Sequence, residues 1–563
     1  MESSEPVRAS VAASDGAGPP QTGHLLESPW QVFVVVLVLA FSNMAVWSLA
    51  TPFFASPDEP AQVARAVALV HGDLIGKTVR NDGNAITDIT VPEVYATGAS
   101  YVSCFSFKAT VPASCAAPLP RSKKEVRTTT YVGRYPPLYY AIVGIPSLFT
   151  SSGDGMYAMR LVSSFVNALF IALAAMSVAA WSRSRLLLVG LLVAATPMTF
   201  FLGSVVNPSG LEIASATCLW CAGLVLALER YGDPPPGLVA VVAVSAGTLL
   251  LSRALSPLWV GAIVLILALL SGWQGVRSIA QARSMRWSLV PLGLLAVFAI
   301  GWIVVAHALD LLPVGAKSHE TGIPLAASIL GNTGPWIQQM IGVFGWLDTL
   351  SPLLTYLVWY AVTGLFVLLA LGSARVRHAG ALALLAAVVI FVPVAISYGQ
   401  AHRLGVIWQA RYIMPMAVGV PLLAVALVER SDALRRVRTR VATMVCAALA
   451  VATFAAFAEA LRRYATGVNG PINYLNGSWQ PPFGATALTV AALVVIVLLA
   501  AVVAYAVAID PVPDEPGTLP ADPPPGGRHR ASRPEDGKHV MDSRGSGEGG
   551  TVRARPGPTT SEP

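Results

Sequence analysis

The stretch SPDEPAQVARA, residues 56–66, directly follows the first long apolar run of the chain. It places two adjacent carboxylates, Asp58 and Glu59, where the chain is expected to leave the lipid and meet water. Elsewhere this mostly apolar chain holds few acids outside its two tails and one long loop. We therefore expect both carboxylates to face an active site at the membrane surface, with the remaining helices built around them.

The composition is that of a membrane protein. Of the 563 residues, 55% are hydrophobic and only 12% are charged, whereas soluble domains carry about 25% charge. Apolar runs of about 20 residues, the length needed to cross a bilayer as a helix, recur along most of the chain. The net charge of +7 lies mostly in short loops, where Lys and Arg set topology, so no nucleic-acid partner is expected. The fold class is an all-α polytopic membrane protein in contact with membrane lipid.

The apolar runs predict about 12 transmembrane helices inside a membrane domain that covers residues 29–508. Residues 1–28 and 509–563 are rich in Pro, Gly, Ser and charge, and are predicted to be disordered tails. The predicted spans are approximately residues 30–49, 156–180, 186–206, 211–229, 237–252, 255–271, 287–308, 353–372, 380–397, 411–429, 441–460 and 484–508.

The distribution of arginines predicts the orientation of these spans. With both termini inside, the short inner loops hold more arginines than the short outer loops, and the cluster 435–440 is the largest. The protein is therefore expected to be a multi-pass protein of the plasma (inner) membrane with both termini in the cytoplasm. Two large loops, 53–135 and 309–352, are expected outside.

The opening stretch also has the pattern of a helix start. Ser56 suits the N-cap, Pro57 suits the first helical position, and Glu59 lies three residues after the cap, which is a capping box. Apolar residues then recur at helical spacing as far as Gly72, which predicts a short amphipathic helix lying against the membrane face. Helix capping accounts for Glu59 but leaves Asp58 free to point elsewhere.

The cysteines are too few for a disulfide framework. Cys104 and Cys115 share the first outer loop, otherwise irregular or a small β element, and could pair if that loop is extracytoplasmic. Cys218-x-x-Cys221 has redox spacing but lies in an apolar helix without a βαβ context, so we expect these cysteines to face lipid or the core and not to have a redox role.

Two arginines stand at the outer face, where the topology rule disfavours them. Arg253 lies between two spans with almost no loop, and Arg411 starts a span. Guanidinium groups suit bidentate binding of phosphate, so one interpretation is a phosphate site at the outer leaflet. The alternative is that these arginines reach lipid headgroups or pair with Asp348 or Glu320 for structural reasons.

Four further residues complete the candidate substrate-binding set. Gln409 and His402 lie in the same stretch as Arg411. Asp348 lies at a predicted helix entry, where an N-terminal cap is the competing interpretation. Asn207 lies in a short outer turn, where it suits a turn or cap position as well as a substrate contact.

The carboxylates of Asp58 and Glu59 admit three roles. They can stabilise the positive end of a helix, act as a general base toward an acceptor hydroxyl, or hold a divalent cation against a phosphate. The sequence leaves a divalent-cation cofactor open, and no set of metal ligands is assigned. A base or a cation beside a phosphate site is the chemistry of group transfer from a lipid phosphate carrier.

Several short motifs follow one another along residues 30–480. They are Phe54-x-x-Pro57-Asp58-Glu59-Pro60-Ala61, Tyr135-Pro136-Pro137-Leu138-Tyr139-Tyr140, Arg160-Leu161, Asn207-Pro208, Gly345-Trp346-Leu347-Asp348-Thr349 and Gln409-Ala410-Arg411-Tyr412-x-x-Pro415. The order and spacing of these motifs resemble those of the bacterial DUF2142 membrane-protein family. That family is similar in overall architecture to the GT-C glycosyltransferases. Those enzymes use polyprenyl-phosphate sugars and carry an acidic pair in the first outer loop.

The resemblance implies a GT-C-like fold with Asp58 as the leading catalytic candidate and Glu59 beside it. Two positions depart from the family pattern: Gln62 stands where a His often follows the acidic pair, and Ser209 stands where an Asp often follows Asn-Pro. The leading hypothesis is a glycosyltransferase that moves a sugar from a polyprenyl-phosphate donor to an envelope glycan, lipid or protein. The alternatives are a transporter or flippase of an envelope precursor, and a non-catalytic membrane protein of envelope assembly. If the chain is an enzyme, Asp58, Arg411 and Asp348 should converge at one outer-face cavity.

Overall fold

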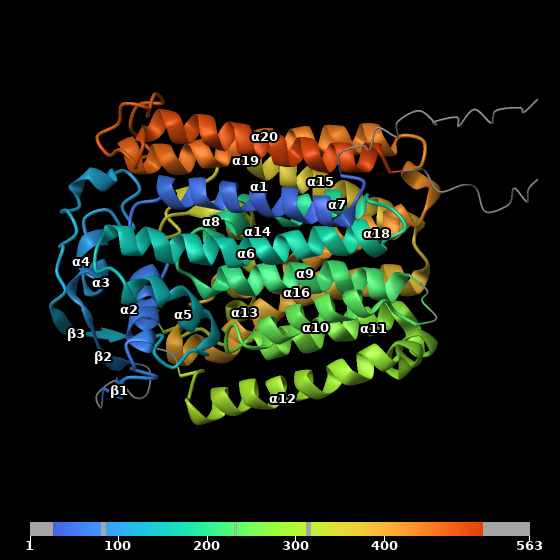
Figure 1. The fold of residues 1–563 in the computed structure, drawn as a ribbon, viewed down its shortest axis with the longest axis horizontal. Coiled ribbons are helices and arrows are strands. Elements are labelled where there is room, and N and C mark those ends of the chain that lie inside the picture. The colour runs from blue at the N-terminus through green and yellow to red at the C-terminus, as the bar shows by residue number, and fades with distance from the viewer. Residues whose placement is uncertain (1–25, 80–85, 230, 232, 311–316, 511–563) are drawn as a thin grey trace, which may run out of the picture. The chain divides into compact units, whose positions relative to one another are not determined.

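Long apolar helices make up most of the structure (Figure 1). The computed structural model describes residues 26–79, 86–229, 231, 233–310 and 317–510, so the tail predictions for 1–28 and 509–563 fall almost entirely outside the described residues. Within the described ranges, nine helices are long and apolar enough to cross a membrane. They are α1 (Pro29–Ala50), α6 (Gly153–Trp181), α9 (Pro208–Leu228), α11 (Ser256–Gln281), α12 (Arg283–Val305), α15 (Leu353–Ser373), α16 (Val376–Leu404), α19 (Arg438–Thr466) and α20 (Gly484–Ala508).

The three other predicted spans are short or broken. The breaks coincide with Pro197 and Pro415, each in the first turn of a new helix piece, because proline removes a backbone donor and clashes with the preceding turn. A mostly helical membrane protein is confirmed. The described residues contain nine full-length spans where twelve were predicted. The shorter pieces are α7 (Leu187–Ala194), α8 (Pro197–Gly203), α10 (Pro236–Leu250), η4 (Ala410–Tyr412), α17 (Met414–Ala417) and α18 (Gly419–Glu429).

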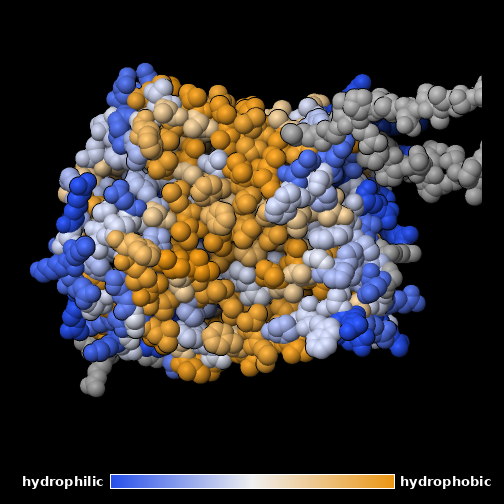
Figure 2. Space-filling model, in the orientation of Figure 1, coloured by the Kyte–Doolittle hydropathy of each residue, from blue (hydrophilic) through white to orange (hydrophobic). Residues whose placement is uncertain are grey.

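The surface of the described helices carries a broad hydrophobic band between two hydrophilic ends (Figure 2). Helix α12 contributes strongly to this band, with Val290, Leu294 and Val297 exposed on its surface. Exposed apolar side chains on this scale mark a surface that contacts lipid or another protein. The band therefore fits the hydrocarbon layer of a membrane.

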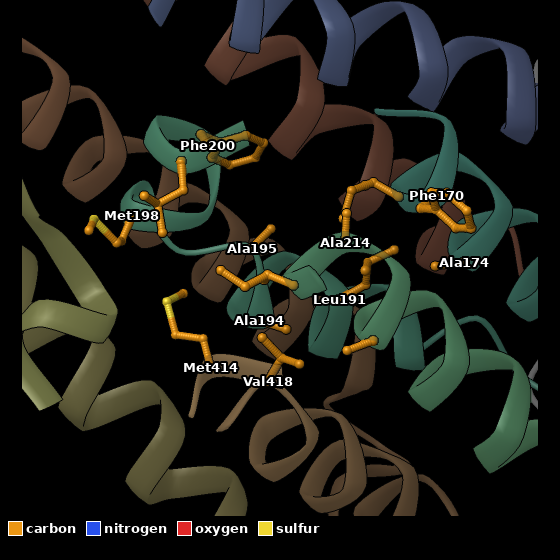
Figure 3. Close-up of a cluster of buried hydrophobic side chains, with 14 of the residues drawn as sticks. Phe170, Ala174, Leu191, Ala194, Ala195, Met198, Phe200, Ala214, Met414 and Val418 are labelled. Carbon is orange, nitrogen blue, oxygen red and sulfur yellow. The ribbon is translucent and has the colours of Figure 1, made fainter. Parts of the chain in front are cut away.

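The short helices α7, α8, α17 and α18 are mostly buried inside this band, whereas α10 is partly exposed, for example at Val244. Figure 3 shows the interior where α6, α7, α8, α9 and α17 meet. Helix α9 is the most deeply buried of the long helices, and it packs against α6, α10, α11 and α18. The buried side chains drawn there include Phe170, Leu191, Met198, Phe200, Ala214 and Met414.

A small α/β region covers one end of the helices and contains most of the predicted loop 53–135. Its antiparallel sheet has the order β1 (Lys77–Thr78), β2 (Thr87–Pro92), β3 (Glu125–Thr130), which confirms the predicted β element. The other pieces of this region are α2 (Glu59–Val70), α3 (Glu93–Ala96), α4 (Gly98–Val102), η2 (Ala113–Cys115), α5 (Leu138–Val143) and η3 (Ile145–Leu148).

Helix α2 lies inside this region and not on a membrane face. It packs against β2, β3, α3, α4 and α5, and most of its residues are buried, including Gln62 and Arg65. The Tyr140 hydroxyl donates to Gln62 Oε1 at 2.5 Å, and Arg65 donates to the carbonyl of Asp73 at 3.3 Å. The predicted short helix ending before Gly72 is therefore confirmed. Its predicted surface position is wrong, because its polar side chains find partners within the protein.

The second large loop, 309–352, is partly outside the described residues and otherwise folded. Its pieces are α13 (Gly322–Gly331), α14 (Thr333–Gly342) and a hairpin of β4 (Val343–Phe344) and β5 (Thr349–Leu350). A further 3-10 turn, η5 (Asp432–Leu434), precedes α19.

The two ends of the described chain lie together. Arg185 Nη1 donates to the Leu26 carbonyl at 2.8 Å, and its backbone N–H donates to Asp510 Oδ2 at 2.9 Å. Both residues are therefore at the end of the helices where α1 begins and α20 finishes. The α/β region follows the other end of α1, so it lies at the opposite end of the helices.

The Cys104–Cys115 disulfide is formed in the α/β region, and Cys218, Cys221 and Cys446 are free and buried. We expect the purified protein, denatured without reductant, to react with three equivalents of a maleimide reagent, and with five after reduction. A double variant, Cys104→Ser with Cys115→Ser, should give three under both conditions. Five adducts without reductant would contradict the pairing.

Candidate active site

The turn between α1 and α2 holds Asp58 in a defined position. Phe54 and Asp58 both have left-handed backbone conformations, with φ of 59° and 63°; aspartate is one of the few non-glycine residues that adopt this region readily. The Pro57 carbonyl between them accepts from Asn207 Nδ2 at 3.0 Å and from Arg411 Nη1 at 3.2 Å. Two distant parts of the chain thus hold the backbone next to Asp58.

The predicted capping box is not present. Helix α2 begins at Glu59, and Asp58 is its N-cap residue without a side-chain cap hydrogen bond. The Ser56 hydroxyl is buried without a partner in the described residues. The prediction fails because Glu59 makes a stronger, charge-assisted interaction with Arg160 in place of the local one.

Glu59 and Arg160 form a fully buried, bidentate ion pair. Arg160 Nε donates to Glu59 Oε1 at 2.7 Å and Nη2 donates to Oε2 at 2.6 Å, and both side chains are 0% exposed. The Val206 N–H also donates to Glu59 Oε1, at 3.1 Å. Glu59 is therefore sealed from solvent and joins the start of α2 to α6. Arg160 also donates to three carbonyls at the end of α1, those of Ser48, Thr51 and Pro52.

Asp58 pairs with Arg411 across 353 residues of sequence. Arg411 Nη2 donates to Asp58 Oδ2, and the Tyr131 hydroxyl donates to Oδ1 at 2.7 Å. The side chain of Asp58 is 24% exposed and that of Arg411 is 2% exposed. Asp58 is thus the partner in this pair that an incoming molecule can reach.

The surroundings of Asp58 keep its carboxylate ionised. Burial by itself raises the pKa of Asp58, but the Arg411 charge, the Tyr131 hydrogen bond and the Arg253 charge outweigh burial and lower the pKa below its ordinary value. Burial and the nearby Asp58 carboxylate raise the pKa of Tyr131. Tyr131 therefore keeps its proton and remains a hydrogen-bond donor to Asp58.

Arg253 lies in the turn between α10 and α11, at the same end of the helices. Its Nη1 donates to Ser209 Oγ at 3.1 Å and pairs with Glu212 Oε2 at 3.4 Å. The Ser256 hydroxyl donates to the other Glu212 oxygen at 2.8 Å. The first turn of α9 and the start of α11 thus position the Arg253 guanidinium.

The ring of Tyr412 brings the two arginines together. The Cζ atoms of Arg253 and Arg411 lie 4.7 Å and 5.3 Å from the ring centroid, within cation–π range. The Nε atoms of both arginines are buried without a hydrogen-bond partner in the described residues. Two guanidiniums thus lie against one ring, each already paired with a carboxylate, Arg253 with Glu212 and Arg411 with Asp58.

Three of the other predicted site residues lie in different surroundings. Asp348 lies between β4 and β5, not at a helix entry, and accepts from Arg463 Nη2 at 2.9 Å. Of the three residues expected to converge, Asp58 and Arg411 meet, whereas Asp348 has its own ion pair. Gln409 precedes Arg411, and its Oε1 is buried without a partner in the described residues. His402 is exposed near the end of α16, with Nδ1 2.9 Å from the Ser318 carbonyl.

Sequence reasoning missed several residues of this arrangement. Glu212 and Arg160 carried a signal, since charged groups in apolar runs are costly and usually face a partner or a site. Tyr131 carried none: it follows β3, and β3 is placed by a hydrogen bond of 3.0 Å from Thr130 Oγ1 to the Ala61 carbonyl. Tyr412 was quoted only as part of a motif. Their roles depend on contacts that only the fold creates.

The residues around Asp58 suit a general base better than they suit a binding site for a divalent cation. In the described ranges, no group of three His, Cys, Asp or Glu side chains is arranged to hold a metal ion. The carboxylate of Asp58 is neutralised by Arg411, and that of Glu59 by Arg160. Mg²⁺ and Ca²⁺ are bound by several oxygen ligands, which this pairing with arginines does not provide.

Comparison with known proteins finds no detectable match among curated sequences. Two solved structures are distantly similar: the crystal structures of ArnT from Cupriavidus metallidurans in the apo state and bound to undecaprenyl phosphate. Both have 13% sequence identity to this chain and a TM-score of 0.42. The apo structure matches over 86% of this chain and 77% of ArnT, and the second over 85% and 75%.

A family model described as "Predicted membrane protein (DUF2142)" matches residues 41–420. The match begins within α1 and ends within α18, so it spans more than half of the chain. It includes Asp58, Tyr131, Arg253 and Arg411. The chain therefore belongs to the DUF2142 family of predicted membrane proteins.

Proposed function

We propose that this protein is a GT-C-type glycosyltransferase that moves a sugar from a polyprenyl-phosphate donor to a cell-envelope glycan, lipid or protein. The observation that carries the proposal is the contact between a partly exposed carboxylate, Asp58, and a buried guanidinium, Arg411, at the polar end of apolar helices. Arg253 stands beside them on the ring of Tyr412. A base in contact with a phosphate-binding group is what transfer from a lipid phosphate requires.

The proposed topology puts this site on the outer face of the plasma membrane. The chain would cross the membrane twelve times, three times through the short or broken segments α7–α8, α10 and α17–α18, with both termini in the cytoplasm. The Cys104–Cys115 disulfide supports an extracytoplasmic α/β region, because disulfides persist in oxidising compartments.

The donor would place its phosphate on Arg411 and Arg253 and its polyprenyl chain in the apolar interior. A cavity of about 180 Å³ lies along α17, the helix that directly follows Arg411. Met340, Trp359 and Met414 contribute to its almost wholly apolar lining. This apolar cavity, on the helix that follows Arg411 in the sequence, would take part of the lipid chain while Arg411 and Arg253 hold the phosphate.

Asp58 would serve as the general base of a direct displacement. It takes the proton of the acceptor hydroxyl while that oxygen attacks the anomeric carbon of the sugar. The bond between this carbon and the phosphate oxygen breaks, and polyprenyl phosphate leaves with its charge neutralised by Arg411 and Arg253. Asp58 then returns the proton to water.

The Asp58–Arg411 pair also links donor binding to base strength. In the empty site Arg411 lowers the pKa of Asp58, which makes the carboxylate a weak base. A donor phosphate competes for Arg411, and the pKa of Asp58 then rises because burial dominates. The base thus gains strength when a donor is in place.

Arg411→Gln is expected to weaken donor binding by roughly 10- to 100-fold, the value of one or two charge-assisted hydrogen bonds. It should also raise the pKa of Asp58, so the fall in kcat/KM at acidic pH should begin at a higher pH. Initial rates measured across donor concentration and pH test both effects. Arg403→Gln, at an exposed arginine near the end of α16, is the control and should change neither.

The proposal is tested by assaying the purified, reconstituted protein with a panel of radiolabelled polyprenyl-phosphate sugars and a cell-envelope extract as acceptor. We expect one donor class to transfer its label to the extract. If no donor is used, and the protein instead moves a labelled envelope precursor across the vesicle bilayer, the transporter hypothesis replaces this one.

A further inference from the structure

A polar cavity lies at the end of the helices opposite to Asp58. Helix α9 begins after Asn207, which contacts the Pro57 carbonyl, and ends before Glu229, which lines this cavity. At 1.5 Å per residue the 21 residues of α9 span roughly 30 Å. The cavity has a volume of about 780 Å³, within the range of roughly 300–1,000 Å³ typical of ligand pockets. It is therefore a separate site.

The described lining of this cavity carries four guanidiniums and one carboxylate. Glu229 is shared by two of the arginines: its Oε2 lies 3.1 Å from Arg183 Nε and its Oε1 lies 2.7 Å from Arg430 Nη2. Within the described part of the chain, Arg375 and Arg377 have no carboxylate partner. The cavity thus has an excess of positive charge.

Arg377 is held by a kink in the neighbouring helix. Gly272, with φ of 68° and ψ of 168°, interrupts the helical conformation of α11. Arg377 Nη2 donates to the Leu270 carbonyl at 2.8 Å, and a Cβ atom at Gly272 would lie 2.3 Å from Arg377 Nη1. The glycine therefore lets the guanidinium approach the kink, so Arg377 is fixed at the cavity wall.

Topology alone does not account for this arrangement. The positive-inside rule explains why arginines lie at this end, and the ends of α9 and α18 attract cations such as Arg430. Arg375 and Arg377, however, lie at the N-terminus of α16, a helix of 29 residues with no acid in its first turn. A helix N-terminus favours anions and disfavours cations, so a bound anion would relieve both the helix end and the arginines.

We propose that this cavity binds a phosphate-bearing anion, either the headgroup of a membrane lipid or a soluble phosphate compound. Arg375 and Arg377 would contact the phosphate at the N-terminus of α16, and Ser271 and Gln274 add hydrogen-bonding groups to the lining. The site is independent of sugar transfer, because none of its residues touches Asp58, Arg411 or Arg253.

The purified full-length protein in neutral detergent tests this proposal through its thermal unfolding midpoint. Inorganic pyrophosphate serves as the soluble probe and dioleoyl phosphatidic acid as the lipid probe, with phosphatidylcholine as the uncharged comparison. We expect a concentration-dependent rise of the midpoint with at least one phosphate probe and none with phosphatidylcholine. A rise with pyrophosphate indicates a soluble ligand, and a rise with phosphatidic acid alone indicates a lipid headgroup.

Substitutions distinguish phosphate binding in this cavity from nonspecific attraction of phosphate to a basic protein surface. Arg375→Gln should lower the affinity for the stabilising ligand by about tenfold, as expected for one charge-assisted contact. Arg375→Lys should lower this affinity less. Arg286→Gln removes an exposed arginine at the start of α12, outside the described lining, and should leave the affinity unchanged. Equal losses in Arg375→Gln and Arg286→Gln, or no response of the unsubstituted protein to either phosphate probe, would overturn the proposal.

Discussion

Asp58→Asn is expected to reduce kcat/KM for sugar transfer by about 10²–10⁴-fold, the usual contribution of a general base. Asparagine has nearly the same shape and also tolerates the left-handed backbone found at this position. Its amide oxygen can still accept from Arg411 while its amide nitrogen donates to the Tyr131 oxygen, but it cannot take a proton from an acceptor hydroxyl. The loss should therefore fall on chemistry and leave the fold intact.

The matched control for this variant is Asp88→Asn. Asp88 lies on β2 in the same α/β region and pairs with the exposed Arg127 at 3.2 Å, so the same isosteric change is made away from the site. Transfer rates and thermal unfolding midpoints of both variants and the unsubstituted protein decide the outcome. Full transfer activity of the Asp58→Asn variant would contradict the assignment of Asp58 as the general base. A large fall in its unfolding midpoint would show that Asp58 is needed mainly for the fold.

Arg160→Leu is expected to destabilise the protein by about 3–5 kcal/mol, the cost of removing one partner from a buried ion pair. The substitution leaves the Glu59 carboxylate uncompensated among buried groups. It also leaves three carbonyls at the end of α1 without their donor. Because this pair joins α1, α2 and α6, the loss should reduce the amount of folded protein before any catalytic measurement is made.

Arg127→Leu provides the comparison, since it breaks an ion pair at the surface, in which the Arg127 side chain is 76% exposed and the Asp88 side chain 34%. Such pairs contribute roughly 0–1 kcal/mol. The yield of monodisperse protein in detergent and its unfolding midpoint should drop for Arg160→Leu and stay near the original values for Arg127→Leu. If Arg160→Leu were fully stable and yet inactive, the Glu59–Arg160 pair would belong to the chemistry and not to the scaffold.

The long spans could be predicted from the sequence because each is apolar over its full length, and length and hydropathy are local properties. The broken segments could not be bounded in the same way. The apolar run 186–206 is long enough to span, and only the positions of Pro197 and Thr196 indicate that it divides into α7 and α8. The interior near Leu191 and Met198 tolerates this break because other helices cover it (Figure 3).

The site could be predicted only in part. Asp58 was singled out as the acid without a local partner, and the structure pairs it with Arg411, which had been singled out as a phosphate ligand. Glu59 was explained by a local cap, but its real partner, Arg160, is 101 residues away. Asp348 was expected to converge with Asp58 and Arg411, but it forms an ion pair with Arg463. Local patterns identify which charges need a partner, while the choice of partner depends on long-range packing.

The Glu59–Arg160 pair has a consequence for the order of synthesis. Glu59 leaves the ribosome first, and Arg160 follows 101 residues later on an apolar helix, where an unpaired arginine costs up to about 2.5–3.5 kcal/mol. The nascent chain can recover this cost as soon as α6 packs beside the α/β region, where Glu59 begins α2. The Asp58–Arg411 pair can form only after Arg411 has been synthesised, a further 251 residues after Arg160. A fragment that stops before Arg411 can therefore contain the Glu59–Arg160 pair but not the Asp58–Arg411 pair.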